Sequence, residues 1–190
     1  MNILCLLGSP RPDGNSAAIA RRFLKTAEKL GAKARVFELN NLNYTGCQAC
    51  WACKTNLDRC ILEDDLKEVL ESLWAADVLV LATPVYFGDV SAQMKAFIDR
   101  TFCYFVPDYA KNPNRSRLAP GKKLVFIIAQ GHPDETRFAG IFSRYEYFFK
   151  WHGFEDTYLI RACGIYHPGD AKKRKDIMKL AEDTANKIFS

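Results

Sequence analysis

Four cysteines lie within fourteen residues of this chain and offer the clearest chemistry in its sequence. Cys47, Cys50, Cys53 and Cys60 follow the spacing C-x2-C-x2-C-x6-C, and four thiolates in a compact run are typical ligands of an iron–sulfur cluster. We therefore interpret them first as ligands of a 4Fe-4S cluster. Three alternatives stay open: a zinc site, which more often pairs two C-x2-C units across a longer loop; a disulfide or redox dithiol; and a metal-free loop that lines a pocket or a subunit contact.

Segment 8–16, with the sequence GSPRPDGNS, could bind a phosphate group. It contains neither the dinucleotide-binding nor the NTP-binding glycine motif. Ser9, Asn15 and Ser16 offer hydroxyl and amide donors, Gly14 lets the backbone approach a ligand closely, and Arg11 adds a positive charge. The N-terminus of the helix predicted to follow would add free N–H groups. Together these groups suit a terminal phosphate monoester, and the alternative is an ordinary turn before a capped helix.

A second candidate loop follows the apolar run VLVLA and contains Pro84, Val85, Tyr86, Phe87 and Gly88. A turn that begins with proline and carries two aromatic side chains could hold a planar ring, while its backbone amides meet the polar edge of that ring. The alternative is that Tyr86 and Phe87 only cover the core. We favour the ring-binding interpretation because the turn falls where the predicted sheet reverses its strand order.

Strands and helices alternate along the whole chain, and this order predicts how the two loops are positioned. Apolar runs predict five strands at 2–7, 32–39, 77–82, 123–129 and 157–163, and helical spacing predicts five helices at 15–30, 64–74, 91–102, 135–151 and 171–189. The fold class is α/β: a flavodoxin-like, doubly wound, five-stranded parallel sheet of order 2-1-3-4-5. We expect a single domain over residues 1–190, with a cysteine-rich loop at 44–61.

In such a sheet a ligand binds at the carboxyl ends of strands 1 and 3, where the order of the strands reverses. Loops 8–16, 83–88 and 130–134 all follow strands and should meet at this edge. The cysteine segment leaves the carboxyl end of the second strand, so we expect it to lie beside the bound ligand.

Composition and charge exclude several classes of protein. The net charge of +5 is mild, and the one basic run, Lys172-Lys173-Arg174-Lys175, opens an amphipathic helix, so we expect no nucleic-acid binding. No apolar run approaches the roughly 20 residues of a membrane span, and the first residues lack the features of a signal peptide. Seven cysteines without such a signal suit a reducing compartment, so we expect a cytoplasmic protein.

The motifs GSPRPDGNS and TPVYFGDVSAQMKAFIDR resemble those of the NAD(P)H-dependent FMN reductases of flavodoxin-like fold. With CQACWACKTNLDRC between them, the chain most resembles the iron–sulfur flavoprotein branch of that family. The resemblance implies that FMN binds with its phosphate in loop 8–16 and its ring against residues 84–88. It also implies ring contacts from Gln130 and Gly131, although the sequence His132-Pro133-Asp134 after them matches no pattern of the family.

The expected function is an FMN-dependent oxidoreductase that takes electrons from NAD(P)H and passes them to a flavin, quinone or other acceptor, with the 4Fe-4S cluster as a relay. One alternative is an electron carrier that a redox partner protein such as ferredoxin reduces. Another is a non-redox binding module with a zinc or empty cysteine loop. No side chain is assigned as a catalytic acid or base. The aromatic-rich segment 136–151 suggests a homodimer or homotetramer. The resemblance implies the same, because proteins of this family place their flavin sites near subunit contacts.

Overall fold

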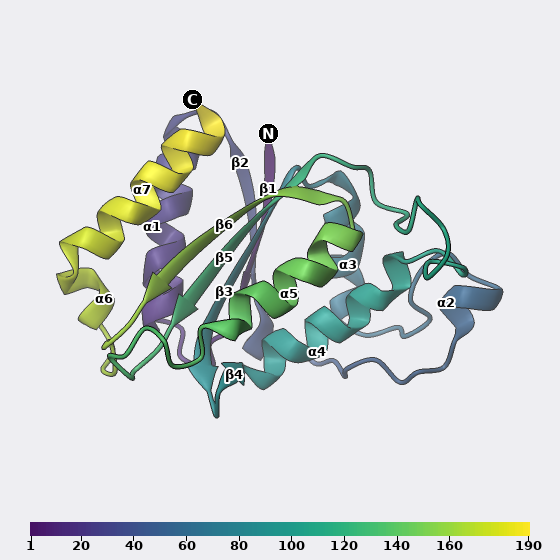
Figure 1. Cartoon of the computed structure of the whole chain (residues 1–190), viewed down its shortest axis with the longest axis horizontal. Helices are drawn as coiled ribbons and strands as arrows, with labels where there is room; N and C mark the ends of the chain where they lie inside the picture. Colours follow the sequence, from purple (N-terminus) through teal and green to yellow (C-terminus); the bar gives the residue numbers. More distant parts are fainter.

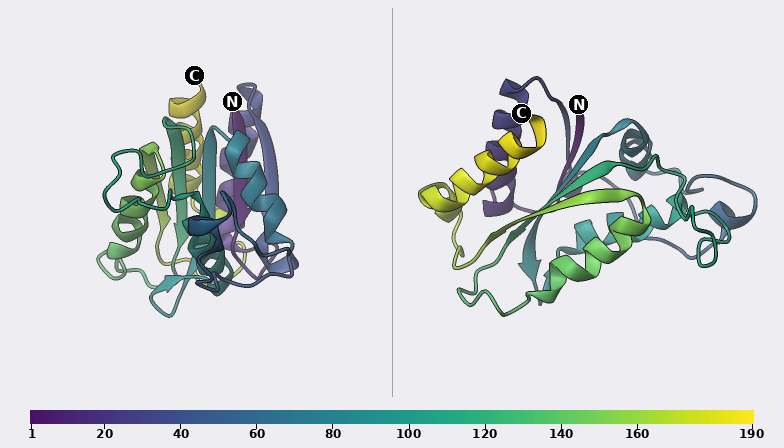
Figure 2. Two further views of the ribbon diagram at one scale, coloured as in Figure 1. Left: turned by 90° about the vertical axis from the view of Figure 1, so that its right-hand side faces the viewer. Right: turned by 45° about the horizontal axis from the view of Figure 1, so that its top comes forward.

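A computed structural model describes all residues, 1–190, as a parallel sheet covered by helices on both faces (Figures 1 and 2). The strand order is β2-β1-β3-β5-β6, and the short β4 pairs antiparallel with the end of β3. With β4 set aside, this is the predicted flavodoxin-like order, so the fold class is confirmed. The strands are β1 (Asn2–Leu7), β2 (Lys33–Glu38), β3 (Val78–Tyr86), β4 (Asp89–Val90), β5 (Lys122–Ala129) and β6 (Phe154–Ala162).

Helices α1 (Asn15–Lys29), α6 (Asp170–Lys173) and α7 (Lys175–Phe189) cover one face of the sheet. The other face carries α3 (Leu66–Ala75), α4 (Ala92–Arg100) and α5 (Gly140–Trp151). Three short elements complete the chain: the 3-10 turns η1 (Leu39–Asn41) and η2 (Thr101–Tyr104), and the single turn α2 (Ala52–Thr55) in the cysteine loop. No helix combines the length and the apolar character that a membrane span requires.

The core forms two apolar layers because the strands are buried on both faces. In β1, Ile3, Cys5 and Leu7 face the layer under α1 and α7, whereas Leu4 and Leu6 face the layer under α3, α4 and α5. Strands buried on both faces read as continuous apolar runs, and this is why the central strands could be located from the sequence.

Three elements differ most from their predicted bounds, besides β6, which begins at Phe154, three residues earlier than predicted. Strand β3 continues past residue 82 to Tyr86 and forms a hairpin with β4, so the proposed ring-binding turn is the end of a strand and the tip of a hairpin. Helix α5 begins at Gly140, five residues later than predicted. The predicted last helix is broken at Arg174 into α6 and α7.

Candidate functional site

The loop after β1 is held by hydrogen bonds at its start, whereas at its end the N-terminus of α1 has free N–H groups. The Gly8 N–H donates to the Ala82 carbonyl at 2.8 Å, and the Ser91 hydroxyl donates to the Gly8 carbonyl at 2.6 Å. Gly14 is the N-cap residue of α1 and has no side chain to accept from the N–H groups of the first turn. Those N–H groups, with the partial positive charge of the helix end, are therefore available to an anion.

Most of the predicted flavin-binding residues line one cavity of about 220 Å³ at the carboxyl edge of the sheet. Loop 8–16 contributes five of them, the end of β3 contributes three, and Gly131 closes the third side. The predicted residues on its wall are Ser9, Arg11, Gly14, Asn15, Ser16, Pro84, Val85, Tyr86 and Gly131. The structure thus brings the candidate phosphate loop and the candidate ring loop together, as the topology predicts.

The side-chain amide of Asn15 is engaged by the protein itself. Its Nδ2 donates to the carbonyls of Ile165, at 3.3 Å, and His167, at 3.0 Å, and its Oδ1 accepts from the N–H of Ala171 at 3.0 Å. The polar atoms of the Asn15 side chain are therefore used within the protein, and its contact with a phosphate stays a prediction. Asn15 joins the start of α1 to the segment that leads into α6.

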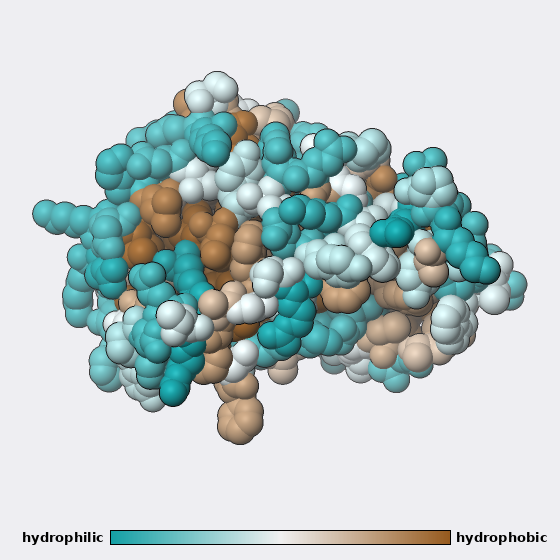
Figure 3. Space-filling view, in the orientation of Figure 1, coloured by the Kyte–Doolittle hydropathy of each residue, from teal (hydrophilic) through white to brown (hydrophobic).

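Two residues of the aromatic hairpin do not line the cavity. Phe87 is fully exposed at the tip, in the left-handed region with φ 51°, and a hydrophobic projection is visible at this end of the molecule (Figure 3). Gly88 has φ 87° and lies under the ring of Phe138, where an added Cβ would come within 3.3 Å. Asp89 holds the hairpin against α5, because its Oδ1 accepts from the Tyr145 hydroxyl at 2.9 Å.

Gln130 is also absent from the cavity wall and is fully buried. Its Nε2 donates to the carbonyls of His132, at 2.8 Å, and Asp134, at 2.9 Å, while its Oε1 accepts from the Arg161 guanidinium at 2.6 Å. The polar atoms of the Gln130 side chain are thus engaged within the protein, and the ring contact of this residue stays a prediction. Gln130 therefore stabilises the backbone conformation of loop 130–134.

The segment after β6 supplies cavity residues that sequence reasoning missed. Ile165, Tyr166 and Pro168 line the cavity, and the Tyr166 ring covers Gly131 so closely that a Cβ there would lie 2.7 Å from it. The carboxyl end of the last strand reaches the same edge of the sheet as the other loops, and this topological signal could have found them.

The four loop cysteines line a second cavity, of about 210 Å³. Cys47 and Cys50 are exposed, whereas Cys53 and Cys60 are half-buried, and all are free thiols. No three His, Cys, Asp or Glu side chains converge closely enough to bind a single metal ion. The thiols instead stand around a mainly apolar space, an arrangement that suits a group wider than one ion.

The backbone on either side of Cys50 is strained. Ala49 and Trp51 both lie in the left-handed region, with φ 50° and 61°, which costs a residue with a Cβ about 1–2 kcal/mol. Strain of this kind persists where surrounding contacts impose it, and it is common at ligand-binding segments. These two residues turn the loop so that the first three cysteines share one cavity.

A fifth cysteine, Cys103, lines the same cavity although it lies more than forty residues from the loop in sequence. Burial, and to a lesser extent negative charge on Cys60 and Cys53, raises the pKa of Cys103 to about 12. Cys103 is therefore a neutral thiol at neutral pH. Its position after α4 gave no local signal of this contact.

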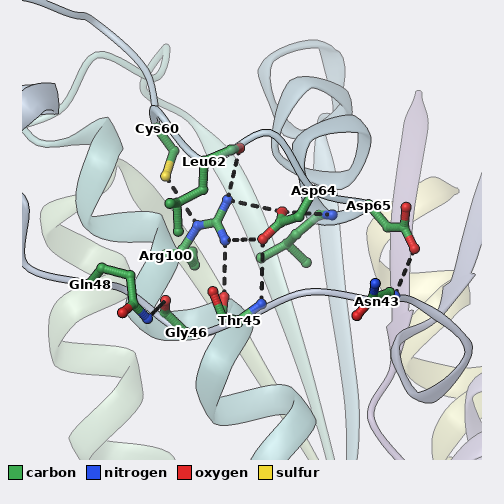
Figure 4. A network of polar contacts seen from close by, with 10 residues as sticks. Asn43, Thr45, Gly46, Gln48, Cys60, Leu62, Asp64, Asp65 and Arg100 are labelled. Carbon is green, nitrogen blue, oxygen red and sulfur yellow. Dashed lines mark hydrogen bonds and ion pairs between the residues drawn. The ribbon is translucent and has the colours of Figure 1, made fainter.

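Arg100 connects the cysteine loop to the end of α4 (Figure 4). It is 1% exposed; its Nε donates to the Cys60 sulfur at 3.1 Å, and its Nη atoms bind both oxygens of Asp64, at 2.7 and 3.2 Å. It also donates to the Thr45 carbonyl at 2.9 Å. Burial alone would raise the pKa of Asp64, but the hydrogen bond and charge of Arg100 outweigh burial and lower that pKa.

Lys54 brings a second buried cation to the cysteines. Its Nζ donates to the carbonyls of Phe102, at 2.7 Å, and Phe105, at 2.9 Å, and lies 3.5 Å from the Cys53 sulfur. Burial lowers the pKa of the Lys54 ammonium, and negative charge on Cys53 opposes that shift. The Lys54 ammonium therefore lies beside the Cys53 sulfur, away from bulk water.

The two cavities lie apart, and the expectation that the cysteine segment sits beside the flavin loops is wrong within one chain. The two cavities share no lining residue. They are reached from opposite ends of α4, because Ser91 at its start bonds loop 8–16 and Arg100 at its end bonds Cys60. The nine residues of α4, which separate these two contacts, span about 13 Å along the helix axis. The segment after η1 runs along α4, where Tyr44 donates to the Gln93 carbonyl, so α2 lies far from α1 and α6 (Figures 1 and 2).

Comparison with known proteins identifies relatives of this chain. The sequence model of the NADPH-dependent FMN reductase family matches residues 1–136. An iron-sulfur flavoprotein of Methanocaldococcus jannaschii is 36% identical over 101 residues, which are 53% of this chain and 52% of that protein. An iron-sulfur flavoprotein of Archaeoglobus fulgidus is 34% identical over 144 residues, which are 76% of this chain and 61% of that protein. The matches thus span only about half to three fifths of these relatives.

Solved structures support the fold. The NAD(P)H:quinone oxidoreductase from Methanothermobacter marburgensis superposes with a TM-score of 0.76 at 20% identity, over 99% of this chain and 96% of that one. At this level of identity the similarity extends to the fold alone.

Proposed function

Because the chain belongs to the NADPH-dependent FMN reductase family, we propose that it is an FMN-dependent oxidoreductase that takes electrons from NAD(P)H and passes them to a flavin, quinone or other acceptor. The observation that carries the proposal is the cavity at the carboxyl edge of the sheet. There, the open N-terminus of α1 and the charge of Arg11 face the same space as Pro84, Val85 and Tyr86.

The residues of this cavity fit FMN. The N–H groups of the first turn of α1, with Ser9, Ser16 and Arg11, would hold one phosphate, and nothing in loop 8–16 matches a dinucleotide motif. The end of β3 and Gly131 would hold the ring, and bound FMN would supply hydride acceptance and electron release. Tyr86 and Tyr166 are 43% and 73% exposed, so their rings are accessible for a nicotinamide or acceptor ring to stack on.

We also propose that Cys47, Cys50, Cys53 and Cys60 hold a 4Fe-4S cluster. Support comes from their common cavity, the strained turn at Ala49 and Trp51, and the buried cations beside the sulfurs. Relatives named iron-sulfur flavoproteins are 36% and 34% identical to this chain over 101 and 144 residues. A zinc ion, a dithiol or a metal-free loop are the competing outcomes.

A second candidate function is that of an electron carrier that a redox partner protein such as ferredoxin reduces. The observation in its favour is that Cys47, Cys50 and Trp51 are exposed, so the cysteine site is open to a docking protein. For either function we propose a single domain and a cytoplasmic protein. We also propose a homodimer or homotetramer, since Tyr147 and Phe148 expose aromatic surface on α5, and light scattering would test this.

The test begins with protein purified without oxygen. Cofactor released by heat should run as FMN, and NADH or NADPH should bleach the flavin absorbance of the intact protein. FAD, or no flavin after reconstitution, would contradict FMN binding. Bleaching by a reduced ferredoxin, but by neither nicotinamide, would favour the carrier.

Iron and acid-labile sulfide test the cluster separately. We expect near four of each per chain, lost in Cys50→Ala but retained in Cys163→Ala, which removes a half-buried thiol outside the loop. Both variants should still bind FMN. Anaerobic protein that carries FMN but no iron would overturn the cluster and leave the flavin proposal standing.

A further inference from the structure

The cysteine site contains more positive charge than the protein itself balances. Lys54 is 7% exposed and forms no ion pair with a carboxylate; its partners are two carbonyls, the Cys53 sulfur and the face of the Phe102 ring, 4.1 Å from Nζ. Burying an ammonium without an anion is costly, so the surroundings of Lys54 favour a negative group within its reach.

Arg117 adds a second cation without a carboxylate partner. Its Nη1 donates to the Cys103 carbonyl at 2.7 Å and to the Phe105 carbonyl, and its Nη2 donates to the Cys53 carbonyl at 3.1 Å. Lys54 and Arg117 therefore both converge on Cys53. Of the three cations bonded to the cysteine site, only Arg100 has a carboxylate, Asp64.

An excess of positive charge, part of it buried, changes the reduction potential of any redox group held by the cysteines. A 4Fe-4S core bound by four thiolates is anionic, and one-electron reduction makes it more negative by one unit; the electron is one that the reduced flavin loses. A cation beside the ligand sulfur stabilises the reduced form more than the oxidised form, and this effect is strong where water is excluded. Charge and hydrogen bonds at the sulfurs are known to set cluster potentials.

We propose that Lys54, supported by Arg117, is the counter-charge of the cysteine site and raises the reduction potential of the 4Fe-4S cluster held there, an inference that rests on the proposed cluster. The effect would favour electron flow from the flavin to the cluster. Lys54 is suited to this role because it follows the ligand Cys53 directly and its Nζ returns to that sulfur.

The competing explanation is that Lys54 only satisfies carbonyl groups at the end of η2. Lys122 provides the matched case: it is 6% exposed, and its Nζ donates to the carbonyls of Trp74, at 3.0 Å, and Ala76, at the end of α3. Neither contact involves a cysteine. A neutral substitution at Lys122 therefore removes a buried ammonium of the same kind without touching the cysteine site.

The experiment compares Lys54→Met, Lys54→Arg and Lys122→Met with the wild type, all purified without oxygen and loaded with FMN. Cluster potential is measured by EPR-monitored redox titration, and iron and sulfide are determined on the same samples. We expect Lys54→Met to lower the equilibrium constant of cluster reduction at least tenfold, which is about 59 mV for one electron. Lys54→Arg should restore most of this loss, and Lys122→Met should leave the potential unchanged.

Each outcome either supports or overturns the proposed role of Lys54. An intact cluster with unchanged potential in Lys54→Met, or an equal shift in Lys122→Met, would overturn the inference. If Lys54→Met loses iron while still binding FMN, retention in Lys54→Arg supports the counter-charge, and loss in both variants contradicts it. Wild-type protein without iron would overturn the proposed cluster and this inference with it, whereas the preceding outcomes leave the cluster standing.

Discussion

Ser91 and Arg100 occupy the two ends of α4, and each fastens a different candidate site to that helix. The Ser91 hydroxyl bonds the Gly8 carbonyl at the start of the phosphate loop, and the Arg100 guanidinium bonds the Cys60 sulfur and Asp64. One rigid element therefore positions both sites.

Gly14→Ala should weaken FMN binding. A Cβ at residue 14 would lie 2.6 Å from the Ser9 hydroxyl oxygen and 3.1 Å from the Arg11 carbonyl, so Ser9 and the backbone of loop 8–16 must shift. Titration of the apoprotein with FMN should show at least a tenfold higher Kd, about 1.4 kcal/mol. Gly140→Ala, where a Cβ meets nothing within 4 Å, is the matched control and should bind FMN normally.

Arg11→Ala combined with Ser9→Ala should also weaken FMN binding, because hydrogen bonds to a charged group contribute roughly 1.5–3 kcal/mol each. The same titration measures the effect. Arg22→Ala, which removes an exposed arginine paired with Glu182 on α7, should leave the Kd unchanged. An equal loss of FMN affinity in the double variant and in Arg22→Ala would mean that the overall positive charge of the protein, rather than loop 8–16, attracts the flavin.

Asp64→Asn should destabilise the fold strongly. Arg100 is buried and has no other carboxylate, and removing one partner of a buried pair costs about 3–5 kcal/mol. Urea unfolding at a fixed FMN concentration measures this loss. Asp99→Asn breaks an exposed ion pair with Lys95 and should lower the free energy of unfolding by at most about 1 kcal/mol. Similar losses of stability in Asp64→Asn and Asp99→Asn would contradict the prediction that the buried pair matters more.

The same pair predicts an acid-sensitive contribution to stability. Because the pKa of Asp64 is lowered in the folded protein, the unfolded chain binds its proton more readily. The contribution is therefore present above the unfolded value, about 3.9, and is lost as the pH falls through the folded value. Asp64→Asn should remove this part of the acid dependence.

His152 predicts a second loss of stability, at milder pH. Burial lowers the pKa of His152 to about 3, and its Nδ1 has no hydrogen-bond partner. The unfolded chain binds this proton near pH 6.5, so stability should fall as the pH drops below that value. Between pH 6.5 and 5 the wild type should lose about 1.5–2 kcal/mol more than His152→Gln; parallel stability curves for the two proteins would contradict this.

Ala49→Gly should stabilise the cysteine loop. Residue 49 has φ 50°, which glycine adopts freely, so the change should add about 0.5–1 kcal/mol to the free energy of unfolding. The control is Ala52→Gly, in the single turn α2, which should reduce stability. Thermal unfolding of both variants measures the difference, and a loss in Ala49→Gly would show that the strain is not released there.

The sheet and the family could be predicted from sequence, because the evidence for both is local. Buried strands such as 78–82 read as unbroken apolar runs, and the motif GSPRPDGNS lies at the end of the first of them. Parallel topology then places residues 9–16 and 84–86 at one edge, which explains why they line one cavity.

Side-chain roles could not be predicted where the partner lies far along the chain. Asn15 is bonded to Ala171, and the direction of the Gln130 side chain depends on Arg161. The path of the cysteine loop along α4 depends on contacts such as Tyr44 with Gln93, and no local pattern encodes them. The strand order fixes where the loop leaves the sheet but not where it ends.

The position of Ser91 and Arg100 on one helix also constrains how the length of the gene can vary. Each residue inserted into α4 would turn everything beyond it by about 100° and advance it by about 1.5 Å. One extra codon there would swing the guanidinium away from Cys60 and Asp64 while the Gly8 end stayed in place. Insertions and deletions should therefore be tolerated in the mainly exposed loop 107–114 but selected against within 92–100, where the rotation of the helix sets the direction of each side chain.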